Sequence, residues 1–141
     1  MRPDKDTYYL NIARAVADRS TCLRRKYGAI IVKDDAIVAT GYNGSPRGIE
    51  NCCDRGTCKR ADLGVAHGER YELCESVHGE QNAVINAARQ GVSVLGGTLY
   101  LYGIDSETGK AIDAEPCMMC SRVIRNAGIV NVIASKAERN D

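Results

Sequence analysis

Two short motifs carry side chains that could act together on a metal ion. The first is His78-Gly79-Glu80, and the second is Pro116-Cys117-Met118-Met119-Cys120. One imidazole and two thiolates make three ligands, the number that catalytic zinc sites use while water takes the fourth position. Glu80 is a poorer zinc ligand than two thiolates, but it is suited to taking a proton from that water and passing it on. The motifs therefore predict a catalytic zinc centre with His78, Cys117 and Cys120 as ligands and Glu80 as the proton shuttle.

Each motif stands where a helix is expected to begin. A helical pattern covers residues 78–89, and a proline opens a second helix over residues 116–126. His78 and Glu80 are two positions apart, about 200° around a helix, so they can share a site only beyond the helix end. We therefore expect the site to face the N-termini of both helices, where unpaired backbone N–H groups favour anions such as thiolates.

The rest of the chain predicts the elements that position this site. Apolar spacing predicts an amphipathic helix over residues 5–19. Runs of β-branched residues predict strands over residues 27–32, 36–42, 97–102 and 129–134. Residues 43–76 and 105–115 lack a sustained period and are expected to form loops. Strands that alternate with helices after an opening hairpin predict an α/β fold with a mixed central sheet.

Length and composition favour one domain over residues 1–141. The chain is 44% hydrophobic and has a formal net charge of +1, from 19 Lys and Arg against 18 Asp and Glu. This charge offers no general attraction for a nucleic acid polymer. No apolar run approaches the ~20 residues that span a bilayer, and the first residues lack the apolar stretch of a secretion signal. We therefore expect no membrane association and a cytoplasmic location.

Seven cysteines are many for a chain of this size. Their odd number, without a secretion signal, argues against a disulfide framework and favours metal ligation or free thiols. Two of them belong to the metal motif. The other five are Cys22, Cys52, Cys53, Cys58 and Cys74. All but Cys22 lie, with His67, in the long segment that lacks a periodic pattern.

Together the two metal motifs match the H-x-E…P-C-x-x-C signature of zinc deaminases, which remove an amino group from a nucleobase. Within this family the chain resembles the deoxycytidylate (dCMP) deaminases from about residue 7 to residue 134. The segments that carry the resemblance are residues 19–22, 28–32, 77–83, 97–100 and 116–120, together with GYNGSPRG at residues 41–48.

This resemblance implies a fold, a reaction and partners. It implies the three-layer α/β/α sandwich of the cytidine deaminases and the zinc-dependent hydrolysis of dCMP to dUMP and ammonia. It also implies a homo-oligomer, often a hexamer, that dCTP activates and dTTP inhibits. Two departures bear on these expectations. Gly79 stands where most relatives have alanine, and the link over residues 103–115 is longer and more acidic than usual.

The same resemblance suggests substrate contacts. Asn43 matches the family's pyrimidine and sugar contact, with a plain turn residue as the alternative. Because the net charge is near zero, local cations must bind the phosphate. The candidates are Arg24, Arg25, Lys26 and Arg47, and a solvated surface position is the alternative for each. Glu69 and Tyr71 resemble the segment beside the substrate pocket, where Tyr71 could stack on the base or pack in the core.

Some members of the family also hold a structural zinc, with cysteines from places that resemble Cys22 and the Cys52-Cys53 pair. In this chain Cys58, His67 and Cys74 could complete such a site. The binding energy of the metal would then keep the long segment ordered. Reduced, buried thiols are the alternative.

Other functions stay open on the sequence alone. One is a deaminase of another nucleoside or base, and a second is a non-catalytic zinc module that binds a nucleotide. Glu80 argues against the second, because a structural zinc site needs no unligated carboxylate. A third is a thiol redox protein built on Cys117 and Cys120, whose activity would survive chelation of metals.

Overall fold

The computed structural model describes residues 1–66 and 73–138 of the chain. Within these residues, strands form one mixed sheet: β1 (Arg25–Lys33), β2 (Ala36–Tyr42), β3 (Thr98–Asp105), β4 (Ala111–Ile112) and β5 (Asn131–Ala134). The order is β2-β1-β3-β4, and β5 also pairs with β3. Strand β3 runs antiparallel to β1 and β4 and parallel to β5. The sheet is therefore mixed, as the sequence predicts.

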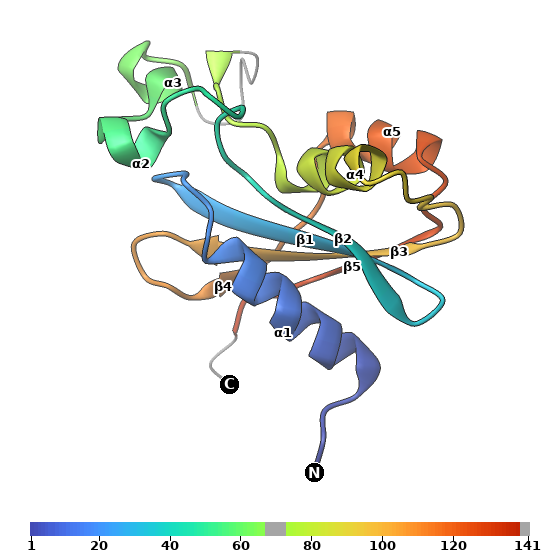
Figure 1. The fold of residues 1–141 in the computed structure, drawn as a ribbon. Coiled ribbons are helices and arrows are strands. Elements are labelled where there is room, and N and C mark those ends of the chain that lie inside the picture. The colour runs from blue at the N-terminus through green and yellow to red at the C-terminus, as the bar shows by residue number, and fades with distance from the viewer. Residues whose placement is uncertain (67–72, 139–141) are drawn as a thin grey trace.

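Helices cover both faces of this sheet. Helix α1 (Lys5–Ala17) lies on one face, and α4 (Gly79–Arg89) and α5 (Met118–Asn126) lie on the other (Figure 1). Two single-turn helices, α2 (Cys52–Arg55) and α3 (Lys59–Asp62), lie in the segment between β2 and α4. The three layers confirm the predicted α/β/α sandwich. None of the described helices is both long and apolar enough to cross a membrane.

Alternate residues of β1 point into two separate cores, as the two-residue period of a strand requires. Ile30 packs with Tyr9 and Ala13 of α1. Ile31 packs on the other side with Ala83 of α4 and Ile124 of α5. Both isoleucines are fully buried. The sheet therefore connects two hydrophobic layers through one strand.

Helix α4 approaches the edge strand β2 closely. A Cβ atom on Gly41 would lie 2.3 Å from the backbone nitrogen of Ala83, so only glycine allows this packing. The side-chain amides of Asn82 and Asn86 donate to the carbonyl oxygens of Tyr42 and Thr40, at 2.8 and 2.7 Å. These bonds satisfy carbonyl groups of the edge strand and fix the position of the helix.

The structure differs from the sequence expectation in several places, and strand β3 continues three residues past its expected end at residue 102. Helix α1 ends at Ala17, two residues before the expected end, and α2 and α3 form within the expected loop over 43–76. Strand β4 lies within the expected loop over 105–115, where Ile112 pairs with Gly103. Asp105 accepts hydrogen bonds from the backbone N–H groups of the turn that follows it, and this local capping closes a hairpin too short to give an alternating pattern.

Candidate active site

The first metal motif stands at the beginning of α4. His78 is the N-cap residue of this helix. Its backbone N–H donates to the Gln81 side-chain oxygen at 3.1 Å, and its carbonyl oxygen accepts from the Asn82 N–H at 2.9 Å. The first turn of α4 therefore fixes the backbone from which the imidazole projects beyond the helix end.

The second motif stands at the beginning of α5. Cys117 is the N-cap residue, and its Sγ atom accepts from the Cys120 backbone N–H at 3.4 Å. Cys120, in the first turn, is fully buried. Both motifs thus lie at helix N-termini, which is where the sequence predicts that their side chains form one site.

The three predicted ligands do meet. His78 Nδ1 lies 3.2 Å from Cys120 Sγ and 3.5 Å from Cys117 Sγ. All three ligand atoms lie within 4.8 Å of one another, and no other group of three His, Cys, Asp or Glu residues in the described part of the chain comes so close. One nitrogen and two sulfur donors are a set that zinc accepts, and three protein ligands leave one position for water or substrate. The residues present therefore fit a catalytic zinc ion.

Glu80 lies beside this group. It belongs to the first turn of α4 and is only 5% exposed. Burial raises the pKa of the Glu80 carboxyl above its usual value, although its own backbone N–H and His78 act in the opposite direction. Burial also raises the pKa of the Cys120 thiol, and the neighbouring Glu80 carboxylate raises it further. The Glu80 carboxyl is therefore in place to exchange a proton beside the three predicted metal ligands.

A cavity of about 710 Å³ opens onto these residues. His78, Glu80 and Cys117 line it together with Asn43. Gly79 lines it as well; a Cβ atom there would lie 3.3 Å from the carbonyl oxygens of Gly41 and Tyr27. Glycine at position 79 thus avoids the tight contact with the sheet that a methyl group would make there.

Comparison with known proteins identifies the family. The family model for the cytidine and deoxycytidylate deaminase zinc-binding region matches residues 3–136. The chain belongs to this deaminase family.

Relatives in the family extend the comparison. The deoxycytidylate deaminase of Mycobacterium phage D29 is 39% identical over 140 residues, covering 96% of this chain and 97% of its own length. That of Schizosaccharomyces pombe is 36% identical over 132 residues, or 94% of this chain. The chain spans only 37% of the length of this yeast relative.

A solved structure from the family has the same fold. It is the dCMP deaminase of cyanophage S-TIM5 in complex with dCMP and dUMP, which is 30% identical and has a TM-score of 0.70. The match covers 95% of this chain and 82% of the phage chain. The cytidine deaminase-like sandwich that the sequence predicts is therefore confirmed.

Asn43 lines the cavity, but its side-chain amide also forms hydrogen bonds with neighbouring residues of the chain. Its Oδ1 atom accepts from the Ser20 hydroxyl and, at 2.8 Å, from the Tyr27 N–H. Its Nδ2 atom donates to the Arg25 carbonyl oxygen at 3.0 Å. Asn43 thereby ties the end of β2 to the beginning of β1, so a contact with substrate would use an amide that the fold already orients.

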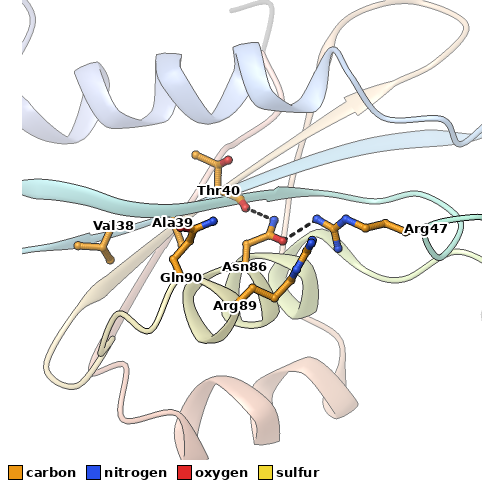
Figure 2. A pocket seen from close by; sticks show the side chains of 7 residues that line it. All are labelled: Val38, Ala39, Thr40, Arg47, Asn86, Arg89 and Gln90. Atoms are coloured by element: carbon orange, nitrogen blue, oxygen red, sulfur yellow. Dashed lines mark hydrogen bonds between the residues drawn. The ribbon is translucent and has the colours of Figure 1, made fainter.

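The residues predicted to bind phosphate lie in different parts of the structure. Arg24 and Arg25 line the catalytic cavity, whereas Lys26 and Arg47 are absent from its lining. Arg47 lines a separate pocket of about 340 Å³, where its Nη2 atom donates to Asn86 Oδ1 at 2.8 Å (Figure 2). Glu69, Tyr71 and His67 lie outside the described residues.

Arg60 is a residue of the cavity lining that the sequence analysis missed. It lies in α3, within the segment that has no periodic pattern. Nothing in its sequence neighbourhood distinguishes it from the other basic residues there.

The cysteines outside the metal motif are all unpaired. Burial raises the pKa of the Cys52 thiol, and Cys22, Cys58 and Cys74 lie near enough to raise it further. We call these four residues the second cysteine group. Cys53 is not part of this group; its side chain is exposed and contacts Asp54.

Proposed function

We propose that this chain hydrolyses dCMP to dUMP and ammonia with one catalytic zinc ion. The observation that carries the proposal is the meeting of His78, Cys117 and Cys120 at two helix starts, with a buried glutamate beside them. Relatives named deoxycytidylate deaminase, and a related structure solved with dCMP and dUMP, support the choice of substrate.

The site residues have distinct roles in this reaction. His78, Cys117 and Cys120 would hold the zinc ion, which would lower the pKa of a water molecule to about 7 and so supply a nucleophile at neutral pH. Glu80 takes one proton from the attacking water and delivers it to N3 of the cytosine ring; it then takes the proton of the new C4 hydroxyl and gives it to the leaving amino group. Oxygen adds to C4, the bond from C4 to the amino nitrogen breaks, and ammonia leaves. The raised pKa of Glu80 suits a group that must both accept and give a proton.

Asn43 and the cavity arginines orient the nucleotide in this proposal. Asn43 presents an amide at the cavity wall, which can contact the pyrimidine or the sugar. Arg24 and Arg25 line the same cavity, and guanidinium groups bind phosphate in a bidentate manner. For Arg47, the position in a separate pocket favours another role.

The second cysteine group is proposed to hold a structural zinc ion. Four thiols are a ligand set typical of closed zinc sites, but no three of these sulfur atoms lie within 4.8 Å of one another in the structure, so a bound ion would have to draw them together. Such a site would join the region before β1 to α2, to the residue before α3 and to Cys74; three of its members, Cys22, Cys58 and Cys74, line the cavity. Cys53 is left out of this site because its side chain is exposed.

A regulated oligomer in the cytoplasm completes the proposal. Unpaired cysteines fit a reducing compartment. Exposed apolar side chains, among them Leu95 and Val130, offer surface for a homo-oligomer such as a hexamer. The effectors dCTP and dTTP carry a triphosphate, and the pocket with the guanidinium groups of Arg47 and Arg89 is suited to that charge (Figure 2).

A substrate panel tests the proposal. Ammonia release is measured with dCMP, deoxycytidine, cytidine, guanine and adenosine, each with and without dCTP and dTTP. We expect dCMP to be the preferred substrate and chelation of zinc to abolish the reaction. Preference for another base would assign a different deaminase activity, and no release from any substrate would favour a non-catalytic nucleotide-binding module.

A further inference from the structure

Part of the cavity wall comes from a segment with little apolar anchorage, residues 52–62, which we call the α2–α3 segment. Helices α2 and α3 have four residues each, too few to be stable alone. Within these two helices only Cys52 and Arg60 are buried. Arg60 lines the cavity, and so does Cys58, the N-cap residue of α3. Because burial of apolar surface contributes little here, polar contacts have to hold this part of the wall in place.

Two such contacts meet at one carboxylate, that of Glu75. Lys59 of α3 donates from Nζ to Glu75 Oε1 at 2.9 Å, and Arg55 of α2 donates from Nη1 to Glu75 Oε2 at 3.4 Å. Each carboxylate oxygen therefore binds one of the two helices. The Arg55 and Glu75 side chains are each only 29% exposed, so solvent and salt screen their attraction less than that of a pair on the open surface.

Glu75 belongs to the segment that leads into the catalytic helix α4. In this segment the Val77 N–H donates to the Gly44 carbonyl oxygen at 2.7 Å, and the Val77 carbonyl oxygen accepts from the Gly44 N–H at 3.2 Å. Three alternate residues of the segment line the cavity, as in extended backbone: Cys74, Ser76 and His78. The Glu75 side chain, between the first two, bonds to α2 and α3 instead. One wall of the cavity is thus attached to the segment that carries the metal ligand His78.

We propose that Glu75 is a positioning residue, which holds the α2–α3 segment against the segment before His78 and so fixes one wall of the substrate cavity. The inference rests on the proposed deaminase function, because it takes this cavity to bind the nucleotide. Glu75 acts on substrate binding rather than on the chemical step, which belongs to Glu80. If the wall is in place in fewer molecules, the apparent affinity for the nucleotide falls in proportion.

Neutralising Glu75 tests the proposal. Glu75→Gln is compared with the wild type in steady-state kinetics with dCMP, in hydrogen exchange of residues 52–62 and in zinc content, because the segment also carries two members of the second cysteine group. Asp62→Asn is the matched control, since it removes an exposed carboxylate from α3. We expect Glu75→Gln to raise KM about 3- to 10-fold, the effect of losing two partly exposed ion pairs, with little change in kcat. Exchange in the segment should become faster, and the zinc content should stay at the wild-type value.

A second variant isolates the ion pair with α3. Lys59→Gln loses one of the two pairs and should raise KM less than Glu75→Gln does. In the double variant Lys59→Gln should add nothing further, because Glu75→Gln has already broken that pair. Lys59→Gln also tests the proposal on its own if Glu75→Gln does not fold.

The outcomes that contradict the proposal are distinct. Wild-type rates of exchange in Glu75→Gln, a lower kcat with an unchanged KM, an equal effect of Asp62→Asn, or loss of zinc from Glu75→Gln would each overturn it. Failure of the wild type to release ammonia from dCMP would instead overturn the proposed function, and the exchange measurement would still show whether Glu75 holds the α2–α3 segment.

Discussion

The two faces of the sheet are packed in the same way but carry different side chains. On one face, a Cβ atom at Gly28 would lie 2.2 Å from the Ala13 carbonyl oxygen of α1; on the other, one at Gly41 would lie 2.3 Å from the Ala83 nitrogen of α4. Each helix therefore rests directly on a glycine of the strand below. The close contact fixes the helix axes on both faces, and the residues at the helix starts decide which face can carry chemistry.

On the α1 face, the polar groups are bonded to one another. Tyr9 donates to Asp35 at 2.7 Å, and Tyr100 donates to Asp6 at 2.7 Å. On the α4 and α5 face, His78, Glu80 and Cys117 line an open cavity. The first arrangement serves stability, whereas the second leaves polar groups for a ligand.

The largest effect is expected at the metal ligands. Cys117→Ser should lose the catalytic zinc and reduce ammonia release to background, because a hydroxyl is a poor substitute for a thiolate ligand. Serine is a good N-cap residue, so α5 should stay folded. Zinc content and activity are measured together. Met118→Ala, at the exposed neighbouring position, is the control, and a serine variant that keeps both zinc and activity would remove Cys117 from the site.

Alanine at the two glycines tests the comparison between the faces. Gly28→Ala and Gly41→Ala should each lower the free energy of unfolding by about 1–3 kcal/mol or more, because a backbone must move to admit the methyl group. Only Gly41→Ala should also lower kcat per folded molecule, since α4 carries His78 and Glu80. Denaturant unfolding and kinetics on the folded fraction measure both effects. Equal losses of kcat would mean that the α1 face also positions the catalytic residues.

The second cysteine group is tested with two adjacent residues. Cys52→Ser should reduce the zinc content from two ions per chain to one and lower Tm, while Cys53→Ser should match the wild type because its side chain is exposed. Elemental analysis and thermal unfolding are the measurements. One zinc ion per fully active wild-type chain would refute the second site.

The smallest effect is expected at Tyr9, a residue of α1. The hydrogen bond to Asp35 raises the pKa of Tyr9 to about 12, so the folded state favours the neutral phenol. The stability that Tyr9 contributes is therefore fully present below its usual pKa of about 10 and is lost between about pH 10 and pH 12. Tyr9→Phe should lower stability less than either glycine variant and leave kcat unchanged. The stability difference from the wild type should shrink across that alkaline range, and a constant difference would contradict the assigned pKa.

The catalytic group could be predicted because its geometry is local. Cys117 and Cys120 are three apart at a helix start, and His78 caps another helix, so spacing and capping rules place each residue without knowledge of the packing. Strand patterns likewise placed β1 and β2 to within two residues. What remained was the relative position of the two helices, and the H-x-E…P-C-x-x-C signature supplied it.

The substrate contacts were less predictable because tertiary packing decides them. Arg47 and Arg60 both lie in the segment without a period, yet one lines a separate pocket and the other lines the catalytic cavity. The Asn43 amide bonds to Ser20 and β1, which a turn motif alone does not reveal. Strand β4 has only two residues, too few for an alternating pattern.

In the proposed reaction Glu80 moves every proton, and one variant tests this role directly. Glu80→Gln is purified, its zinc content is measured, and ammonia release from dCMP is followed beside the wild type. We predict full occupancy of zinc with a rate at least about 100-fold lower, the loss expected when a general acid and base is removed. A zinc-loaded Glu80→Gln protein that releases ammonia at the wild-type rate would contradict the assigned role.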